Sequence, residues 1–437
     1  MNLPQILSLI LLVVILVLAV WRHVNIGLLG FSAAAIMVMA TTAIADGSDT
    51  YTVLSSKDVL SHFPGAIVTL LIGVSLLFAH LEKSGGLSWF TDQIYAKMGH
   101  RTNIVPWIGY FIGFAISTAG AFSTASITLL VPVIAALGRK HPRLFFICEM
   151  AAIIGANTGA LSPINPTGQV ILDAAKKAHV EYSPWLVWFL GMLISFVLVI
   201  ALQIVFQDKR VVETSDYKAS EKGFVLLKPI KQENGDNHQL QPFYAICSTI
   251  AVLIFLILVI FAKANVGLTA LTLAVIMMLF FTQQSKDFVK KIPWNAVVVI
   301  SGLLVFIGTM MQVDTMKAVE QGLLSMTSSK IALLFMLAYL TTFLSNVESS
   351  TLGVISLMIP MVFTIFGDSP QISLILTACA APAMLSVVNP IHIAGTLVVS
   401  VTEEKQQEMM FKRLLIIAFA TVPFFPGLAM IVPALMM

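Results

Sequence analysis

Two polar stretches interrupt long apolar segments of this chain and carry residue types that can bind ions. Residues 161–166 are Leu-Ser-Pro-Ile-Asn-Pro, followed by Thr-Gly, and residues 385–390 repeat the pattern Leu-Ser-x-x-Asn-Pro at an offset of 224 (389 − 165). Proline and glycine interrupt helices, so each stretch predicts a broken helix with free N–H groups at one end and free C=O groups at the other. The N–H ends favour a carboxylate, and the C=O ends favour Na⁺. We therefore predict substrate-binding residues at these breaks: Asn165, Pro166, Thr167, Asn389 and Pro390. The alternative is that the two Asn residues only cap half-helices.

Two further apolar blocks, 104–137 and 330–366, each contain a polar cluster at the middle. The first cluster is Ser-Thr-Ala-Gly at 117–120, and the second is Ser-Asn-Val-Glu-Ser-Ser at 345–350. Each block is too long for one span, and irregular backbone at membrane depth is tolerated only where protein or water satisfies it. We therefore predict two re-entrant hairpins with these clusters at their tips. Two ordinary spans with a polar kink are the alternative for each block.

The hydroxyl, amide and carboxyl groups of these clusters are candidate ligands. A carboxyl group at membrane depth is costly when ionised, so Glu348 is a candidate proton carrier, or else it faces a water-filled vestibule without any coupling role. Helix packing is the other interpretation of the hydroxyl groups. We predict substrate binding by Ser117, Thr118, Ser345 and Asn346, and ion coupling by Ser117, Asn157, Ser345, Asn346 and Glu348.

The composition identifies the class of protein. Hydrophobic residues make up 58% and charged residues 11% of the 437 residues, whereas soluble domains carry about 25% charged residues. The three cysteines are scattered, and neither a metal-binding spacing nor a P-loop, His-Glu-x-x-His or Gly-x-Ser-x-Gly motif is present. We therefore expect an integral membrane protein that is not an enzyme, with no catalytic residue, no nucleic-acid partner, and no metal or cofactor apart from Na⁺ or H⁺ as coupling ion.

Apolar runs of roughly 20 residues predict membrane-spanning helices. If Arg22 faces the cytoplasm, most of the 25 Lys and Arg residues do so as well, as the positive-inside rule requires, and both termini lie outside. We expect a multi-pass protein of a bacterial plasma (inner) membrane. The predicted spans are 4–22, 25–45, 64–82, 145–172, 183–206, 243–262, 265–282, 294–312, 371–400 and 411–435.

Motifs recur in the same order in the two halves of the chain. Asn-Ile-Gly-Leu at 25–28 matches Asn-Val-Gly-Leu at 265–268, and Gly73 and Ser117 match Gly302 and Ser345. Each half has five spans and one hairpin, and this odd number of crossings inverts the second copy, as in secondary transporters. We therefore predict an all-α polytopic membrane protein with a first inverted repeat at 1–206, a cytoplasmic linker at 207–242 and a second repeat at 243–437.

Several of these motifs resemble the malonate/dicarboxylate carrier family (MatC-like), within the ion transporter superfamily that includes the divalent anion:sodium symporters. They are residues 25–28, Gly-Val-Ser-Leu-Leu-Phe at 73–78, Val-Pro-Trp at 105–107, and the first break. The resemblance implies an elevator-type transporter whose scaffold domains form a homodimer. It also implies Ser-Asn-Thr motifs at both tips that bind Na⁺ and substrate carboxylates in sodium-coupled members. Because Asn is missing from the first tip here, coupling to Na⁺, coupling to H⁺ and exchange all stay open.

The leading hypothesis is a secondary active transporter of small di- or tricarboxylates of the malonate, succinate, malate or citrate class. Its partners would be this carboxylate, the lipid bilayer and a second copy of the chain. A cation/proton antiporter of the same superfamily, with Glu348 as the exchanging carboxylate, is the first alternative. A membrane-embedded enzyme is the second.

Overall fold

The computed structural model of the protein is helical throughout the part that it describes, namely residues 2–22, 24–44, 53–86, 104–140, 142–206, 241–327, 329–347, 351–385, 388–390, 392–402 and 404–436. The first half contains α1 (Leu3–Arg22), α2 (Ile26–Ile44), α3 (Ser56–Ser61), α4 (Gly65–Lys83), α6 (Val105–Thr118), α7 (Ser123–Lys140), α8 (Pro142–Gly159), α9 (Pro166–Ala178) and α10 (Pro184–Phe206). The second half contains α11 (Pro242–Ile260), α12 (Val266–Phe280), η1 (Phe288–Lys291), α13 (Trp294–Gln312), α14 (Thr315–Met326), α15 (Lys330–Val347), α16 (Thr351–Phe366), α17 (Ile372–Leu385), α18 (Ile393–Val401) and α19 (Glu404–Met436).

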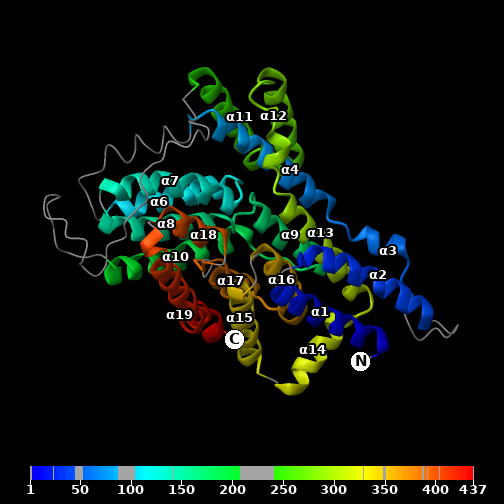
Figure 1. Ribbon diagram of the computed structural model, residues 1–437. Helices are drawn as coiled ribbons and strands as arrows, with labels where there is room; N and C mark the ends of the chain where they lie inside the picture. The colour runs from blue at the N-terminus through cyan, green and yellow to red at the C-terminus, as the bar shows by residue number, and fades with distance from the viewer. Residues whose placement is uncertain are drawn as a thin grey trace.

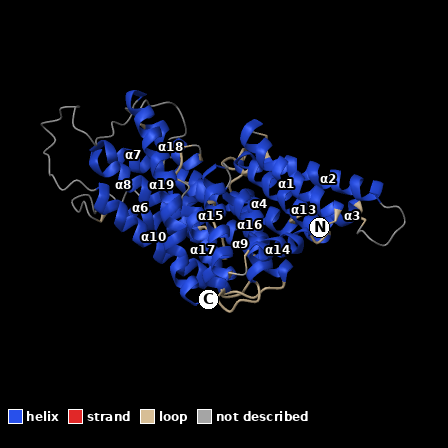
Figure 2. Cartoon of the chain, turned by 90° about the horizontal axis from the view of Figure 1, so that it is seen from below, coloured by secondary structure: helices blue, strands red, loops and turns tan. Residues whose placement is uncertain are grey.

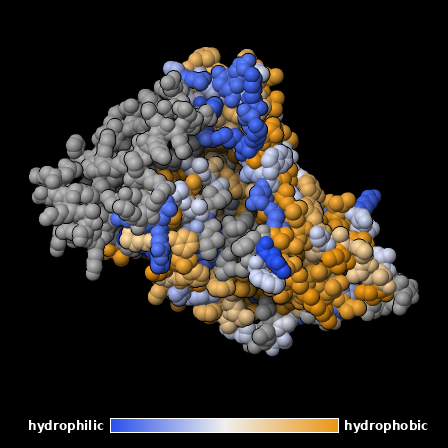
Figure 3. Space-filling model, viewed as in Figure 1, coloured by the Kyte–Doolittle hydropathy of each residue, from blue (hydrophilic) through white to orange (hydrophobic). Residues whose placement is uncertain are grey.

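Six helical stretches among the described residues are long and apolar enough to cross a membrane. Large apolar side chains such as Ile204, Phe243 and Leu435 are exposed on them, and orange surface covers much of the α1 and α2 side in Figure 3. A multi-pass membrane protein accounts for this exposure, because lipid tails replace the missing core. The six are Ile26–Ile44, Ser56–Lys83, Pro184–Val205, Pro242–Ile260, Trp294–Gln312 and Gln406–Met436.

Helices lie where the apolar runs predicted them, with differences at the polar ends. The last helix begins at Glu404, not at 411, because Glu, Lys and Gln are good helix formers and Glu408 pairs with Lys412 at 2.6 Å. The short helices α3 and α14 lie in segments that were predicted to be loops. A capping box between Ser55 and Asp58 starts α3. The predicted linker 207–242 lies outside the described residues except for its last two.

The helices form two groups that lie side by side in Figures 1 and 2. One group consists of α1–α4 and α11–α14, and the other consists of α6–α10 and α15–α19. The groups meet where α9 contacts α4 and where α16 contacts α13 and α14. The two predicted hairpins and the two predicted helix breaks all belong to the second group.

Glycines allow very close helix contacts within the first group. A Cβ on Gly302 of α13 would lie 2.8 Å from the Cα of Gly27 on α2, and a Cβ on Gly73 of α4 would lie 2.6 Å from the carbonyl oxygen of Gly267 on α12. Small residues of this kind let the backbones of membrane helices touch. The glycines that recur in the two halves of the sequence therefore make corresponding contacts, α2 with α13 and α12 with α4.

We expect Gly302→Ala to destabilise the protein by about 1–3 kcal/mol, because the added methyl group forces two backbones apart. Gly322→Ala on α14 is the matched control, since nothing lies within 4 Å of its added Cβ, and alanine should there stabilise the helix by about 0.5–1 kcal/mol. The measurement is the thermal unfolding of both variants in detergent. Equal stability of the two variants would contradict this packing.

Candidate functional site

The first tip, residues 117–122 at the end of α6 and before α7, is formed by a helix-stop signal. Gly120 has φ +115°, its N–H donates to the carbonyl of Ser117 at 3.0 Å, and the N–H of Ala121 donates to the carbonyl of Ile116 at 3.2 Å. These two bonds form a Schellman motif, which glycine favours because it has no Cβ. The polar cluster predicted at the tip thus ends α6 and reverses the chain.

The first break, residues 160–165 between α8 and α9, is bonded to the first tip. The Nδ2 group of Asn165 donates to the carbonyls of Ser117 at 2.8 Å and Ala121 at 2.7 Å, while its Oδ1 accepts from the N–H of Thr167 at 3.0 Å. Ser162 Oγ adds a bond to the carbonyl of Thr118 at 3.0 Å. Asn165 is therefore both the N-cap of α9 and the link between break and tip, with Pro166 at the first helical position.

The second break, between α17 and α18, is bonded to the second tip through Ser345 and Asn346 at the end of α15. The Nδ2 group of Asn389 donates to the carbonyl of Asn346 at 2.6 Å, and Nε2 of His392 donates to the carbonyl of Ser345 at 2.7 Å. His392 occupies the N-cap position of α18. Residues 348–350, 386–387 and 391 lie outside the described part of the chain, and with them the predicted ion-coupling residue Glu348.

These hydrogen bonds correspond at an offset of 227, not at the offset of 224 that the Leu-Ser-x-x-Asn-Pro pattern predicted. His392 corresponds to Asn165 (392 − 165). Each residue immediately precedes a helix and donates a hydrogen bond to the carbonyl of the first serine of a tip. Asn389 corresponds to Ser162 (389 − 162), since each bonds to the carbonyl that follows that serine. The shared Leu-Ser-x-x-Asn-Pro pattern therefore does not mark equivalent positions in the two breaks. A glycine three residues after the N-cap, Gly168 or Gly395, fixes the position of each break.

The side chains of the first tip are satisfied within the protein. Ser117 Oγ donates to Ser126 Oγ at 2.9 Å, and Thr118 Oγ1 accepts from Nε1 of Trp188 at 3.1 Å. Pro166 and Thr167 are buried at the start of α9. Among the predicted ligands in the first half, Asn157 on α8 differs, because its buried Nδ2 has no hydrogen-bond partner.

The second tip, by contrast, holds buried oxygens without partners. Among the described residues, Ser345 Oγ, Asn346 Oδ1 and Thr351 Oγ1 are buried and make no hydrogen bond. Leaving a buried polar group unsatisfied costs about 1–3 kcal/mol, so native proteins seldom do so without a ligand or water. Each of these oxygens, at the ends of α15 and α16, is of a kind that can bind a hard cation or accept a hydrogen bond.

Glu149 on α8 is a candidate that the sequence interpretation missed. The residue is completely buried, and neither carboxylate oxygen has a hydrogen-bond partner. An ionised carboxylate without a partner costs several kcal/mol in such surroundings, so this group can take up a proton. An acidic residue within the apolar run 144–156 was the available signal.

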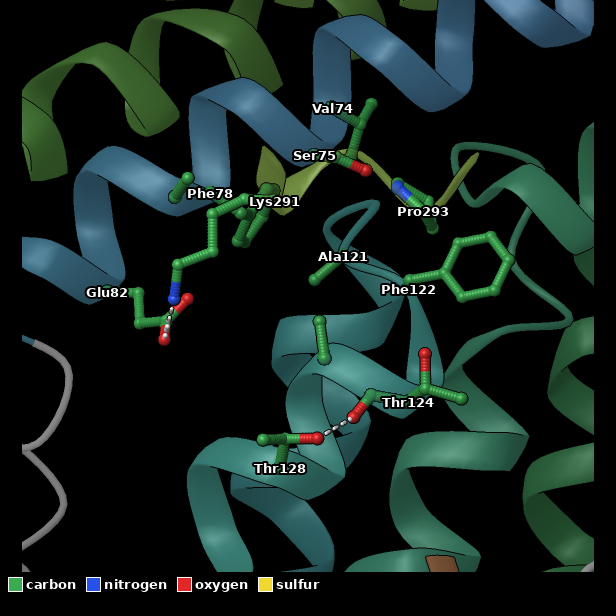
Figure 4. A pocket seen from close by; sticks show the side chains of 12 residues that line it. Val74, Ser75, Phe78, Glu82, Ala121, Phe122, Thr124, Thr128, Lys291 and Pro293 are labelled. Carbon is green, nitrogen blue, oxygen red and sulfur yellow. Dashed lines mark hydrogen bonds and ion pairs between the residues drawn. The ribbon is translucent and has the colours of Figure 1, made fainter. Parts of the chain in front are cut away.

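A cavity of about 270 Å³ lies beside the first tip (Figure 4). Its walls come from α4, from Ala121 and Phe122 of the tip, from α7, and from the segment that joins η1 to α13. Lys291 Nζ lies 3.2 Å from Glu82 Oε1 in the wall. The sequence places Glu82 at the end of the predicted span 64–82 and Lys291 in the loop before the span 294–312, and the pairing of α4 with η1 is not visible in it.

The fold and the paired tips and breaks define an all-helical, multi-pass membrane protein. The crystal structure of the YdaH transporter of Alcanivorax borkumensis, which was described as having an unusual topology, has a similar fold, with a TM-score of 0.55 and 14% identity over 98% of this chain and 97% of that one. The chain belongs to the citrate transporter family (CitMHS), which it matches over residues 14–381. No curated protein sequence matches it. These likenesses are to transport proteins and not to enzymes.

Asn165→Ala should destabilise the protein by more than the loss of a helix cap, because the carbonyl of Ala121 and the N–H of Thr167 lose their partner and the carbonyl of Ser117 keeps only the N–H of Gly120. We expect about 2–4 kcal/mol from two or more unsatisfied buried groups. Asn265→Ala is the matched control, since Asn265 only caps α12 through the N–H of Leu268, and it should cost about 1 kcal/mol. Denaturation midpoints measure both, and equal losses would refute a link between break and tip.

Proposed function

We propose that the protein is a secondary active transporter that moves small di- or tricarboxylates across a bacterial inner membrane, with citrate as the first substrate to test. The observation that carries this proposal is the match to the citrate transporter family over residues 14–381. The helix ends at the two tips and breaks also support an anion site.

The carboxylates would bind between the tips and the breaks. The starts of α9 and α18 present partial positive charge, and nearby side chains add hydrogen-bonding groups. Asn165 would act mainly by positioning, because its amide already holds the first tip. The proposed substrate residues are Ser117, Thr118, Asn165, Pro166, Thr167, Ser345, Asn346, Asn389 and Pro390, joined by His392.

The coupling ion would be Na⁺ at the second tip or H⁺ on a carboxyl group. The unpartnered oxygens of Ser345, Asn346 and Thr351 support a cation there. The completely buried Glu149 supports a proton carrier on α8. Uptake would require a Na⁺ gradient in the first case and a proton gradient in the second.

The mechanism would be an elevator movement of two inverted repeats, 1–206 and 243–437, joined by a linker. Corresponding contacts support the repeats: α2 packs on α13 as α12 packs on α4, and α7 packs on α18 as α16 packs on α9. The bonds between tips and breaks support movement of α6–α10 and α15–α19 as one body, which would slide against α1–α4 and α11–α14. The latter group would form the homodimer.

Proteoliposomes with the purified protein test this function. We expect accumulation of radiolabelled citrate under an inward Na⁺ or proton gradient, and counterflow with internal citrate. Malonate, succinate and malate should compete to different degrees, because they present carboxylates to the same helix ends at different spacing. Uptake driven by a Na⁺ gradient would support the cation site at the second tip; if only a pH gradient drives uptake, Glu149→Gln should remove that dependence. Ion exchange without any carboxylate dependence would contradict the proposal.

A further inference from the structure

We propose that the cavity beside the first tip is a docking site for a substrate carboxylate. In this site the substrate carboxylate replaces Glu82 as the partner of Lys291. This inference rests on the proposed function and adds a site ahead of the tips and breaks. The cavity holds about 270 Å³, close to the lower limit of about 300 Å³ for small-ligand pockets.

The charge in the cavity is concentrated at one end. Among its described lining residues, only Glu82 and Lys291 are charged, and Figure 4 shows their ion pair across the cavity from Phe122 of the first tip. The hydroxyl groups of Ser75 and Thr124 line the space between them. An anion held by Lys291 would thus have polar partners on its way to the tip.

The ion pair is suited to exchange. Its 3.2 Å separation exceeds the usual 2.7–2.9 Å of charge-assisted bonds, and the Lys291 side chain is 50% exposed. A pair this exposed contributes about 0–1 kcal/mol, so a second carboxylate can replace Glu82 at little cost. An ammonium group also has three donors, and Glu82 uses one of them.

Opposite effects of the two neutral variants distinguish docking from a purely structural ion pair. Lys291→Gln should raise the half-saturating citrate concentration by about two- to fivefold, the range for a half-exposed charge pair, and Glu82→Gln should lower it, because the competing carboxylate is removed. Raising the salt concentration should reduce both effects. Lys290→Gln is the matched control: it removes the same charge one residue away, where Lys290 pairs with Asp287 at 2.7 Å and does not line the cavity.

The measurement is citrate counterflow in proteoliposomes, with Lys291→Arg as the variant that keeps the charge and should keep near-normal affinity. Weakened affinity in both Lys291→Gln and Glu82→Gln, or equal behaviour of Lys291→Gln and Lys290→Gln, overturns docking while the proposed function stands. Absence of carboxylate transport by the unmodified protein overturns both.

Discussion

The structure depends on the hydrogen bonds that join each helix break to a hairpin tip. Where α6 and α15 stop, backbone carbonyls lose their helical partners inside an apolar body, and such groups must be satisfied by protein or ligand. Asn165 and Ser162 of the first break bond to these carbonyls at the first tip, and His392 and Asn389 of the second break do so at the second tip. Two irregular segments that would each be unstable alone therefore support one another.

The two pairs differ in what they leave unsatisfied. At the first tip the side chains of Ser117 and Thr118 have partners within the protein. At the second tip Ser345 Oγ and Asn346 Oδ1 have none. The same hydrogen-bonding scheme thus produces a first tip whose Ser117 and Thr118 side chains are bonded within the protein and a second tip with unpartnered oxygens. These oxygens are the reason for proposing the Na⁺ alternative at the second tip.

The positions of the helices could be predicted from the sequence because apolar runs and prolines mark them directly. The tips and breaks could be predicted as well, since a cluster of small polar residues within such a run marks a place where the helix is interrupted. The register of the second break could not be predicted, because Asn165 caps α9 whereas Asn389 does not cap α18. The backbone geometry around Gly395 decides the N-cap position there. Lys291 and Glu149 were missed because their importance arises from which helices pack against them.

Citrate binding by Ser345→Ala tests most directly whether the second tip holds the ligand. The substitution removes a hydroxyl oxygen that has no partner and leaves the carbonyl of Ser345 bonded to His392, so the protein should keep its stability. Citrate binding, measured calorimetrically with Na⁺ present, should weaken at least about tenfold, or about 1.4 kcal/mol. Ser248→Ala, which removes a buried and bonded hydroxyl group on α11, should leave binding unchanged. Unaltered citrate affinity in Ser345→Ala would contradict a ligand site at the second tip.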